Sequence, residues 1–461
     1  MLRRHLKWHS LCFENSCQLE GWAQKFLQIL PQEIDPSKKQ SPKDFSRESK
    51  LPFQKLITFI LSIVASGTNK GVDVKSGEFF RNAYLSGLWP EAEAIHRTTL
   101  TKARRKVDWT IFRDILGDAV DLAYQCWPQS PQFTWHGLSV FATDGSRYDL
   151  PATEELRKVF DPKSGLQYSG KGHYPQCLVS TTYDVFRRLP VARTVVPLNG
   201  SEREEAKELI PYVPSGSVLL FDRGYPSYEL IRHLLRSFKG YFIFRCPALC
   251  TFPAVEAFIK SGKEEGEIWI APSGNYLEKV SARQRRILRA LRIRVVKLQS
   301  PDGTVSVLLT NLYNTLDFPR EEIIDLYFRR WEVEGYYRDE KIVLEIERFH
   351  GKTPNSIRQE LYAAMIMAVI SRSLMVLSSR MFGETPAEPQ FKNAIMTLAS
   401  QATVLSAEDP QRAIQIFRLI LKEIYRVKYY RPKSPRPSQP RVTKKPLNKW
   451  ADSKRKKVAN A

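Results

Sequence analysis

Hydrophobic and polar positions predict a helical first part of the chain. Up to about residue 127, apolar residues recur at helical spacing. The apolar run at residues 56–65 is too short to cross a bilayer and predicts a buried helix over 52–66. A polar connector precedes it at 35–50, and further helices are predicted at about 77–86, 90–97, 100–106 and 109–124.

From residue 138 the pattern predicts strands alternating with helices. Short apolar runs bounded by turn residues predict strands at 138–144, 176–186, 191–197, 217–222 and 240–245. Helices follow at 201–210, opened by the capping box Ser201-Glu-Arg-Glu204, and at 227–237. The first and fourth strands end in Asp144 and Asp222, at the position where α/β sheets usually place ligand sites. Aspartate is also common in turns after strands, so each residue alone is weak evidence.

Residues 246–317 predict a β-rich segment with a basic surface. Strand-like runs occupy 267–271, 292–298 and 305–310. Between Lys279 and Lys297 there are eight Lys or Arg residues and no acidic residue. A solvated face normally mixes signs, so we predict a surface that follows phosphates.

The segment 327–341 reads as one helix with chemically loaded residues on a narrow face. The residues within an arc of roughly 60° are Tyr327, Arg330, Glu334 and Lys341. An adjoining apolar stripe is expected to hold the helix on a core, with Arg329, Glu332 and Glu340 projecting away; the stripe consists of Ile324, Phe328, Trp331 and Ile342. A carboxylate beside a phenol, a guanidinium and an ammonium suits a metal-bound phosphate. The alternative is a solvated helix face with i,i+3 and i,i+4 pairs.

After this segment the pattern predicts a long apolar helix at 357–377 and smaller helices at 389–400 and 407–425. Residues 431–461 carry eleven Lys or Arg and one Asp, with prolines early on. We expect this tail to be disordered in isolation.

Charge narrows the class of partner. The 71 Lys and Arg outnumber the 49 Asp and Glu, a formal net charge of +22. That surplus implies a polyanion, most commonly nucleic acid, while 43% hydrophobic residues exclude a disordered polycation. Short predicted helices joined by a tight turn resemble a helix-turn-helix, and the one at 100–106 carries Lys102, Arg104, Arg105 and Lys106; the alternative is an ordinary basic surface helix.

The six cysteines are scattered and are expected to be reduced thiols of a cytoplasmic protein. His5, His9, Cys12 and Cys17 match no standard zinc-finger spacing, so we do not expect zinc there.

The spacing Tyr327-x2-Arg330-x3-Glu334-x6-Lys341 resembles the YREK signature of the insertion-sequence-four family of bacterial DDE transposases. Asp144 in Ala-Thr-Asp-Gly-Ser and Asp222 in Leu-Leu-Phe-Asp-Arg-Gly-Tyr resemble the other two catalytic blocks. The resemblance implies an α/β, ribonuclease H-like catalytic core, an order of elements that the predicted strands and helices also follow. The implied division is an all-α DNA-binding domain at 1–127, core segments at 138–245 and 318–377, a β-rich basic insertion at 246–317, a helical C-terminal region at 378–430 and the tail at 431–461.

The resemblance also implies the chemistry. Asp144, Asp222 and Glu334 would be catalytic and hold two Mg²⁺ ions, with Mn²⁺ able to substitute. The protein would cleave the ends of its own insertion sequence, with a hairpin route as one option, and transfer the 3′-hydroxyl ends into target DNA. Tyr327, Arg330 and Lys341 would grip phosphates.

Further contacts are expected around this centre. The other candidate DNA contacts are Lys102, Arg104, Arg105, Arg285, Arg286 and Arg289. Trp269 is a candidate for stacking on a flipped base, with core packing as the alternative role. The partners expected are transposon-end and target double-stranded DNA and a second copy of the chain in a synaptic homodimer. We expect no membrane, no small-molecule substrate, and a cytoplasmic, nucleoid-associated location.

Two alternatives remain from the sequence. The first is a catalytically silent DNA-binding derivative, against which the intact acidic triad argues. The second is a stand-alone ribonuclease H-like nuclease, which would not need the basic insertion, the candidate helix-turn-helix or the basic tail.

Overall fold

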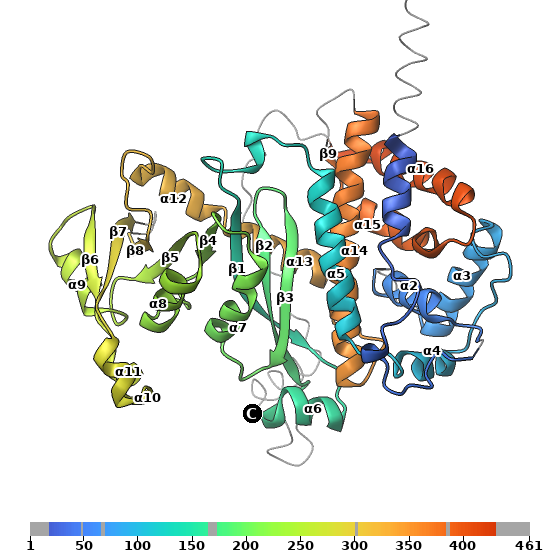
Figure 1. Ribbon diagram of the computed structural model, residues 1–461, viewed down its shortest axis with the longest axis horizontal. Helices are drawn as coiled ribbons and strands as arrows, with labels where there is room; N and C mark the ends of the chain where they lie inside the picture. Colours follow the sequence, from blue (N-terminus) through green and yellow to red (C-terminus); the bar gives the residue numbers. More distant parts are fainter. Residues whose placement is uncertain are drawn as a thin grey trace, which may run out of the picture. The chain divides into compact units, whose positions relative to one another are not determined.

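The computed structural model describes residues 18–47, 49–65, 70–164, 173–299, 303–383 and 388–429 (Figure 1). Contacts divide the chain into two units, residues 1–428 and 429–461, and the fold below is that of the first unit. The predicted disordered tail, and His5, His9, Cys12 and Cys17, lie outside the described residues. The four described cysteines, Cys126, Cys177, Cys246 and Cys250, are free thiols.

One eight-stranded mixed sheet organises residues 140–310 of the unit, in the order β3-β2-β1-β4-β5-β8-β7-β6 (Figure 1). Its strands are β1 (Val140–Asp149), β2 (Gln176–Asp184), β3 (Leu189–Pro197), β4 (Val218–Phe221), β5 (Tyr241–Pro247), β6 (Glu265–Ile270), β7 (Leu291–Gln299) and β8 (Val305–Thr310). The chain meanders antiparallel through β1, β2 and β3, and then β4 and β5 run parallel to β1. The predicted mixed α/β class is therefore confirmed.

The five strands predicted from the pattern are all present, but β1 is longer than expected. It continues to Asp149, so Asp144 lies within the strand and not at its end. The parallel pairing of β1 with β4 nevertheless stops at Thr143 and Phe221, the residues just before Asp144 and Asp222. Asp144 and Asp222 therefore each follow one member of the last residue pair between β1 and β4.

Three helices accompany these first five strands. They are α6 (Glu154–Phe160), α7 (Glu202–Leu209) and α8 (Tyr228–Ser237), of which α6 was not predicted. The predicted capping box of α7 is wrong, because the Ser201 side chain makes no capping hydrogen bond. A 3-10 turn, η4 (Ile210–Tyr212), ends that helix. Another 3-10 turn, η3 (Pro162–Ser164), follows α6.

The segment predicted as a β-rich insertion continues the same sheet. β8 pairs antiparallel with β5, with Ile243 opposite Thr310 at one end and Pro247 opposite Ser306 at the other. β7 then pairs with β8, and β6 pairs with β7. Its helices are α9 (Pro253–Lys260), α10 (Gly274–Lys279) and α11 (Ala282–Ile287). β6 is therefore an edge strand of the large sheet.

The N-terminal region is helical, as predicted, apart from one element. Residues 18–27 are helical, and the elements that follow are η1 (Pro36–Lys38), α2 (Phe53–Val64), α3 (Val72–Leu85), α4 (Arg97–Arg104), α5 (Thr110–Cys126) and η2 (Pro131–Phe133). The helix predicted at 90–97 is wrong, because residues 92–96 have no regular structure. Ile95 instead bonds the Ser76 hydroxyl through both its N–H and its carbonyl oxygen.

The long helix α14 (Pro354–Phe382) runs through the middle of the unit. It is longer than the predicted 357–377, and α2, α5 and β3 pack against it. Among the described helices, only α14 is long and apolar enough to cross a membrane, but 83% of its most apolar window is buried inside the protein. Protein contacts thus cover the apolar surface of this helix.

The C-terminal helices also pack on α14. They are α15 (Phe391–Ser400), η5 (Ala402–Ser406) and α16 (Pro410–Arg426), close to their predicted positions. Two short strands are β9 (Glu388–Pro389) and β10 (Lys428–Tyr429), the second of which spans the division between the units.

Candidate active site

The segment 327–341 is two helices, so the prediction of one continuous helix is wrong. α12 (Arg320–Phe328) ends before Arg330, and α13 (Trp331–Ile342) starts after it. The predicted apolar stripe is also wrong, because Phe328, Trp331 and Ile342 are 50%, 52% and 68% exposed. The buried residues of α13 are Val333, Tyr336, Tyr337 and Glu340.

The break places the Arg330 guanidinium among three carboxylates. Arg330 Nη2 lies 2.7 Å from Glu334 Oε1 and 3.9 Å from Asp222 Oδ1, and Nη1 lies 3.5 Å from Asp144 Oδ2. Glu334 is one helical turn after Arg330, and the two aspartates come from β1 and the end of β4. The three carboxylates predicted from separate parts of the chain therefore converge on one buried cation.

Burial dominates the electrostatics of this centre. It raises the pKa of Asp144 to about 7, although Arg330 and the Gly145 N–H oppose the shift. Burial likewise raises the pKa of Tyr327 to about 12. Burial alone would lower the pKa of Arg330, but Tyr327 and the neighbouring carboxylates raise it above its ordinary value, so the guanidinium stays charged.

A fully buried ion pair anchors α13 to the sheet. Arg193 on β3 donates from Nη2 to both oxygens of Glu340, at 2.8 and 2.9 Å, and Tyr336 donates to Glu340 at 2.6 Å. The Tyr337 hydroxyl donates to the Asp144 carbonyl oxygen at 2.6 Å. The expectation that Glu340 projects away from the core is therefore wrong.

Sequence reasoning missed this anchor. Its signal was the spacing of Val333, Tyr336, Tyr337 and Glu340 at i, i+3, i+4 and i+7, which is the pattern of a buried helix face. Because the last of these positions is occupied by Glu340, a charged residue, this face was taken to be exposed to solvent.

The other two signature residues lie apart from each other. Tyr327 on α12 is buried beside Arg330. Lys341 donates to the Arg147 carbonyl oxygen at 2.5 Å, lies over the Tyr148 ring and is 3.7 Å from Glu347. Lys341 thus sits along β1, beyond the three carboxylates.

The donor set suits a hard divalent cation. Three carboxylates provide the oxygen ligands that Mg²⁺ and Mn²⁺ prefer. Within the described residues, however, no three His, Cys, Asp or Glu side chains are grouped tightly enough to hold a metal ion, because Arg330 lies between the three carboxylates. The three carboxylates have the oxygen ligands that such an ion requires, and the Arg330 guanidinium between them sets the distances that separate them in this structure.

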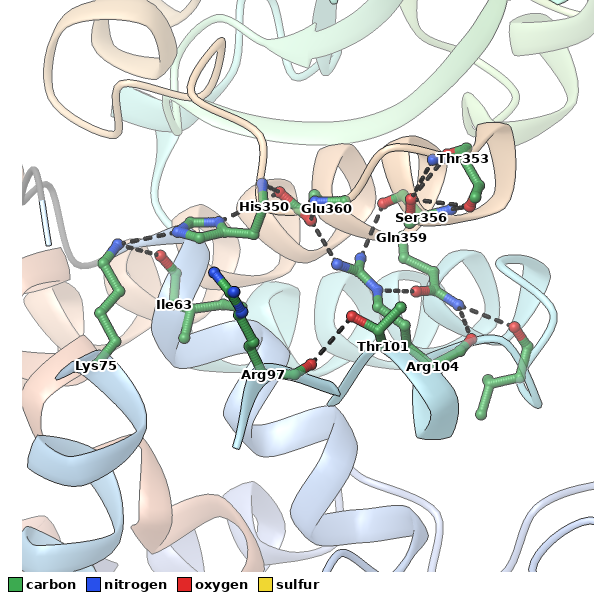
Figure 2. Close-up of polar contacts among 12 residues, drawn as sticks. Ile63, Lys75, Arg97, Thr101, Arg104, His350, Thr353, Ser356, Gln359 and Glu360 are labelled. Atoms are coloured by element: carbon green, nitrogen blue, oxygen red, sulfur yellow. Dashed lines mark hydrogen bonds and ion pairs between the residues drawn. The ribbon is translucent and has the colours of Figure 1, made fainter. Parts of the chain in front are cut away.

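Arg104 does not belong to an exposed basic face, and that expectation is corrected. It is buried, and its guanidinium donates to Gln359 at 3.0 Å, Glu360 at 2.6 Å and the Ser356 carbonyl oxygen at 3.0 Å (Figure 2). Lys102 and Arg105 on either side of it are exposed. Arg104 therefore ties the end of α4 to α14 and is removed from the candidate DNA contacts.

The basic run between Lys279 and Lys297 is only partly a free surface. Arg294 is buried and donates to the Leu312 and Phe318 carbonyl oxygens, while Arg292 and Lys297 pair with Glu267 and Glu264. The acidic partners thus come from β6 and the turn before it, and they lie outside residues 279–297, where the sequence shows no acidic residue. The exposed members without an ion pair in the described chain include Arg285, Arg286 and Arg289.

Trp269 is 61% exposed on the edge strand β6, so core packing is not its role. Figure 1 shows β6 and α11 at one end of the sheet, with β1 and α13 nearer its middle. The candidate contacts at this end are therefore separate from the three carboxylates.

Comparison with known proteins adds the family. Residues 135–370 match the family model described as "Transposase DDE domain". The chain belongs to the DDE transposase family. This confirms the resemblance that the three acidic blocks indicated. The match begins just before β1 and ends inside α14, so it contains all three carboxylates and Arg330.

The relatives are transposases as well. The chain is 25% identical over 300 residues to the transposase InsG for insertion sequence element IS4 of Escherichia coli (strain K12). The aligned region covers 64% of this chain and 65% of that protein. It is 35% identical over 83 residues to the probable transposase for insertion sequence element IS5377 of Geobacillus stearothermophilus, covering 18% and 21%.

Among solved structures, the DDE-family chain is similar to a piggyBac transposase synaptic complex with hairpin DNA. The likeness has 13% identity and a TM-score of 0.42, and it covers 89% of this chain and 79% of that one.

Proposed function

We propose that this chain is a DNA transposase with a ribonuclease H-like core. It binds the ends of its own insertion sequence, cleaves them by metal-dependent phosphodiester hydrolysis and transfers the 3′-hydroxyl ends into target DNA. The observation that carries the proposal is the convergence of Asp144, Asp222 and Glu334 on Arg330. Membership of the DDE transposase family supports it.

The proposed chemistry assigns one role to each element. Asp144 on β1, Asp222 after β4 and Glu334 on α13 would hold two Mg²⁺ ions, which when bound activate water and stabilise the charge on the phosphate. Arg330 offsets part of the negative charge of the three carboxylates and holds them together, and the Arg193–Glu340 pair fixes the helix that carries Glu334. The buried strands and α13 thus supply a rigid support for the ligands.

Contacts to DNA are proposed for the exposed cations around this centre. Lys341 has a 31% exposed side chain and remains a candidate phosphate contact with Tyr327 and Arg330, which lie deeper. Lys102, Arg105, Arg285, Arg286 and Arg289 are exposed and stay in the proposal. The net charge of +22 supports a polyanionic partner.

Second-strand cleavage through a hairpin is proposed as one route, with Trp269 as the ring that stacks on a flipped base. Its exposure leaves the indole accessible for stacking. Because two ends must be cut together, we propose a synaptic homodimer, acting at the nucleoid in the cytoplasm.

The deciding experiment incubates purified protein with the terminal DNA of its own element and Mg²⁺, Mn²⁺ or EDTA. We expect metal-dependent cleavage at the end by the wild type, and none by Asp144→Asn, Asp222→Asn or Glu334→Gln, with end binding largely kept. Glu332→Gln is the matched control, because Glu332 lies on the same helix and pairs with Arg188 outside the centre. Specific binding without cleavage in either metal would favour a catalytically silent derivative.

A further inference from the structure

The polar connector at residues 35–50 and helix α4 line a pocket of about 720 Å³. Among the described residues that line this pocket, none is acidic. Its cations come from both walls, with three from the connector and two from α4 and the turn after it: Lys43, Arg47, Lys50, Lys102 and Lys106. A concave surface that collects charge of one sign attracts ions of the opposite sign. The pocket therefore favours an anion.

Most of this charge has no partner within the described protein. Lys50 pairs with Glu93 at 2.8 Å, and both side chains are well exposed. Glu48 lies outside the described residues and can offset only one further charge. The cations whose side chains make no hydrogen bond or ion pair among the described residues are Lys43, Arg47 and Lys102. Cations gathered in this way repel one another until an anion lies between them.

Backbone hydrogen bonds fix one wall of the pocket to the other. Lys39 in the connector and Val107 after α4 form an antiparallel bridge. Beside it, the Gln40 N–H donates to the Lys106 carbonyl oxygen at 3.1 Å. The connector thus keeps a set position relative to the cations of α4 and does not hang free.

Phe45 holds the turn of the connector in place. Its φ of 57° lies in the left-handed region, which a bulky residue adopts only where the surroundings impose it. Its ring lies 5.9 Å from the buried Phe53 ring, and Lys106 Nζ lies 5.8 Å from it on a face. The Asp44 carboxylate accepts from the Ser41 N–H at 2.9 Å and so closes the same turn. The wall is therefore formed before any ligand binds.

The position of α4 suits contacts to phosphate better than contacts to bases. A recognition helix reads bases because its side chains project into the major groove. Lys102 and Lys106 instead line a concave pocket opposite the connector, and Arg104 is buried against α14 (Figure 2). Lysine binds phosphate as a point charge, and four of the five cations of the pocket are lysines.

We propose that this pocket binds the phosphate backbone of duplex DNA. The inference rests on the proposed function, because DNA is the polyanion that this function requires. It makes the connector, which the sequence marks only as polar, a DNA-binding element through Lys43 and Arg47. It also gives α4 the task of positioning the backbone and not of reading the sequence.

The test measures binding of the full chain to two duplexes by fluorescence anisotropy over a range of salt concentrations. One duplex is the terminal DNA of its own element, and the other has an unrelated sequence of the same length. We expect Lys43→Gln and Arg47→Gln each to weaken binding to both duplexes by the same factor. Each should also lower the slope of log affinity against log salt by about one, because one phosphate contact is lost.

The matched control is Arg81→Gln, which removes an exposed cation of α3 outside the pocket and should leave affinity and slope as in the wild type. Lys43 and Arg47 are exposed, so an unchanged Tm shows that their variants are folded. Weaker binding to the terminal DNA alone would overturn the inference, because the pocket would then read sequence.

Two further outcomes separate this inference from the proposed function. Unchanged affinity and salt slope in both variants, with end cleavage kept, would overturn the inference and leave the proposed function standing. If the wild type binds neither duplex, the proposed function fails and the inference fails with it.

Inorganic tripolyphosphate distinguishes DNA from free phosphate as the source of the anion. We expect tripolyphosphate to displace both duplexes from the wild type, because it offers the same phosphate oxygens. If it binds the wild type but not Arg47→Gln, while the two proteins bind DNA equally, the pocket belongs to a free polyphosphate and the proposal is overturned.

Discussion

Arg330 is the residue on which the candidate active site depends. Its guanidinium lies within 4 Å of three carboxylates, and its own side chain is almost fully buried. Like charges that close repel strongly in a medium of low dielectric constant. Arg330 therefore acts as the internal counter-charge of the centre whenever cations are not bound.

Removing that counter-charge should make the protein depend on metal for stability. We expect Arg330→Ala to lower the Tm in EDTA and to gain more from added Mg²⁺ or Mn²⁺ than the wild type does, because bound cations replace the guanidinium. Arg329→Ala, an exposed neighbour, is the control. Differential scanning calorimetry checks this, and equal metal-induced shifts in both variants would contradict it.

Glu340 is the second residue on which the site depends, because it stabilises the fold that holds the site and takes no part in the proposed reaction. Glu340→Gln leaves the Arg193 guanidinium buried without a counter-ion, which typically costs about 3–5 kcal/mol. Urea unfolding should show that loss, whereas Glu332→Gln, which removes a partly exposed pair with Arg188, should change the free energy of unfolding by less than about 1 kcal/mol. Similar effects of the two substitutions would remove the anchoring role.

The acidic triad was predictable at this scale because its spacing and flanking residues are local. The partners of those residues were not. Nothing near Glu340 in the sequence indicates Arg193, and nothing near Glu334 indicates how close the two aspartates lie. Both depend on the pairing of strands far apart in the chain.

At the scale of elements, the break between α12 and α13 changes which residues face the core. Each helix alone has helical spacing, so the pattern suggests one helix through both. Residues 329 and 330 separate the two helices, and the side of α13 that meets the core carries Val333 while Trp331 is half exposed, so the apolar stripe predicted through both helices is not the buried one.

That difference has a direct test in unfolding experiments. We expect Trp331→Ala to cost about 1 kcal/mol at most, since the indole is half exposed and its contact with the Arg330 guanidinium is a cation–π contact near the surface. Val333→Ala should cost about 2 kcal/mol, because its side chain is fully buried. The apolar stripe predicted from the sequence, which includes Trp331 and not Val333, would give the reverse order.

At the scale of the whole molecule, the parts predicted as separate are joined by strand pairing and buried charge. β8 extends the sheet that carries Asp144, and Arg104 and Glu360 connect α4 to α14 (Figure 2). Composition and periodicity show where one kind of predicted secondary structure gives way to another. Pairing between distant strands decides whether that point is also a boundary between domains. For that reason the strands of residues 246–317 were predictable and their continuity with β5 was not.

The Arg104–Glu360 pair predicts how stability depends on pH. Arg104 and His350 overcome the effect of burial and lower the pKa of Glu360 to about 2, from an ordinary value of 4.5. A lowered pKa stabilises the fold above about 4.5, and this contribution is lost as pH falls through about 2. We therefore expect the Tm difference between wild type and Glu360→Gln to be full at neutral pH and to shrink below about pH 4.5.

The control for this series is Glu93→Gln, which removes an exposed pair with Lys50 and should change the Tm little at any pH. A Tm difference for Glu360→Gln that stays constant from pH 7 to pH 3 would contradict the role of the buried pair.

The central position of α14 has a consequence for how the protein is made. Helices α2 and α5 leave the ribosome well before residues 354–382, the partner on which their apolar sides pack. Until that stretch is synthesised, the N-terminal helices have no completed core, and the nascent chain exposes apolar and basic surface together. Synthesis therefore sets the order of events: the N-terminal region becomes native only after most of the message has been read.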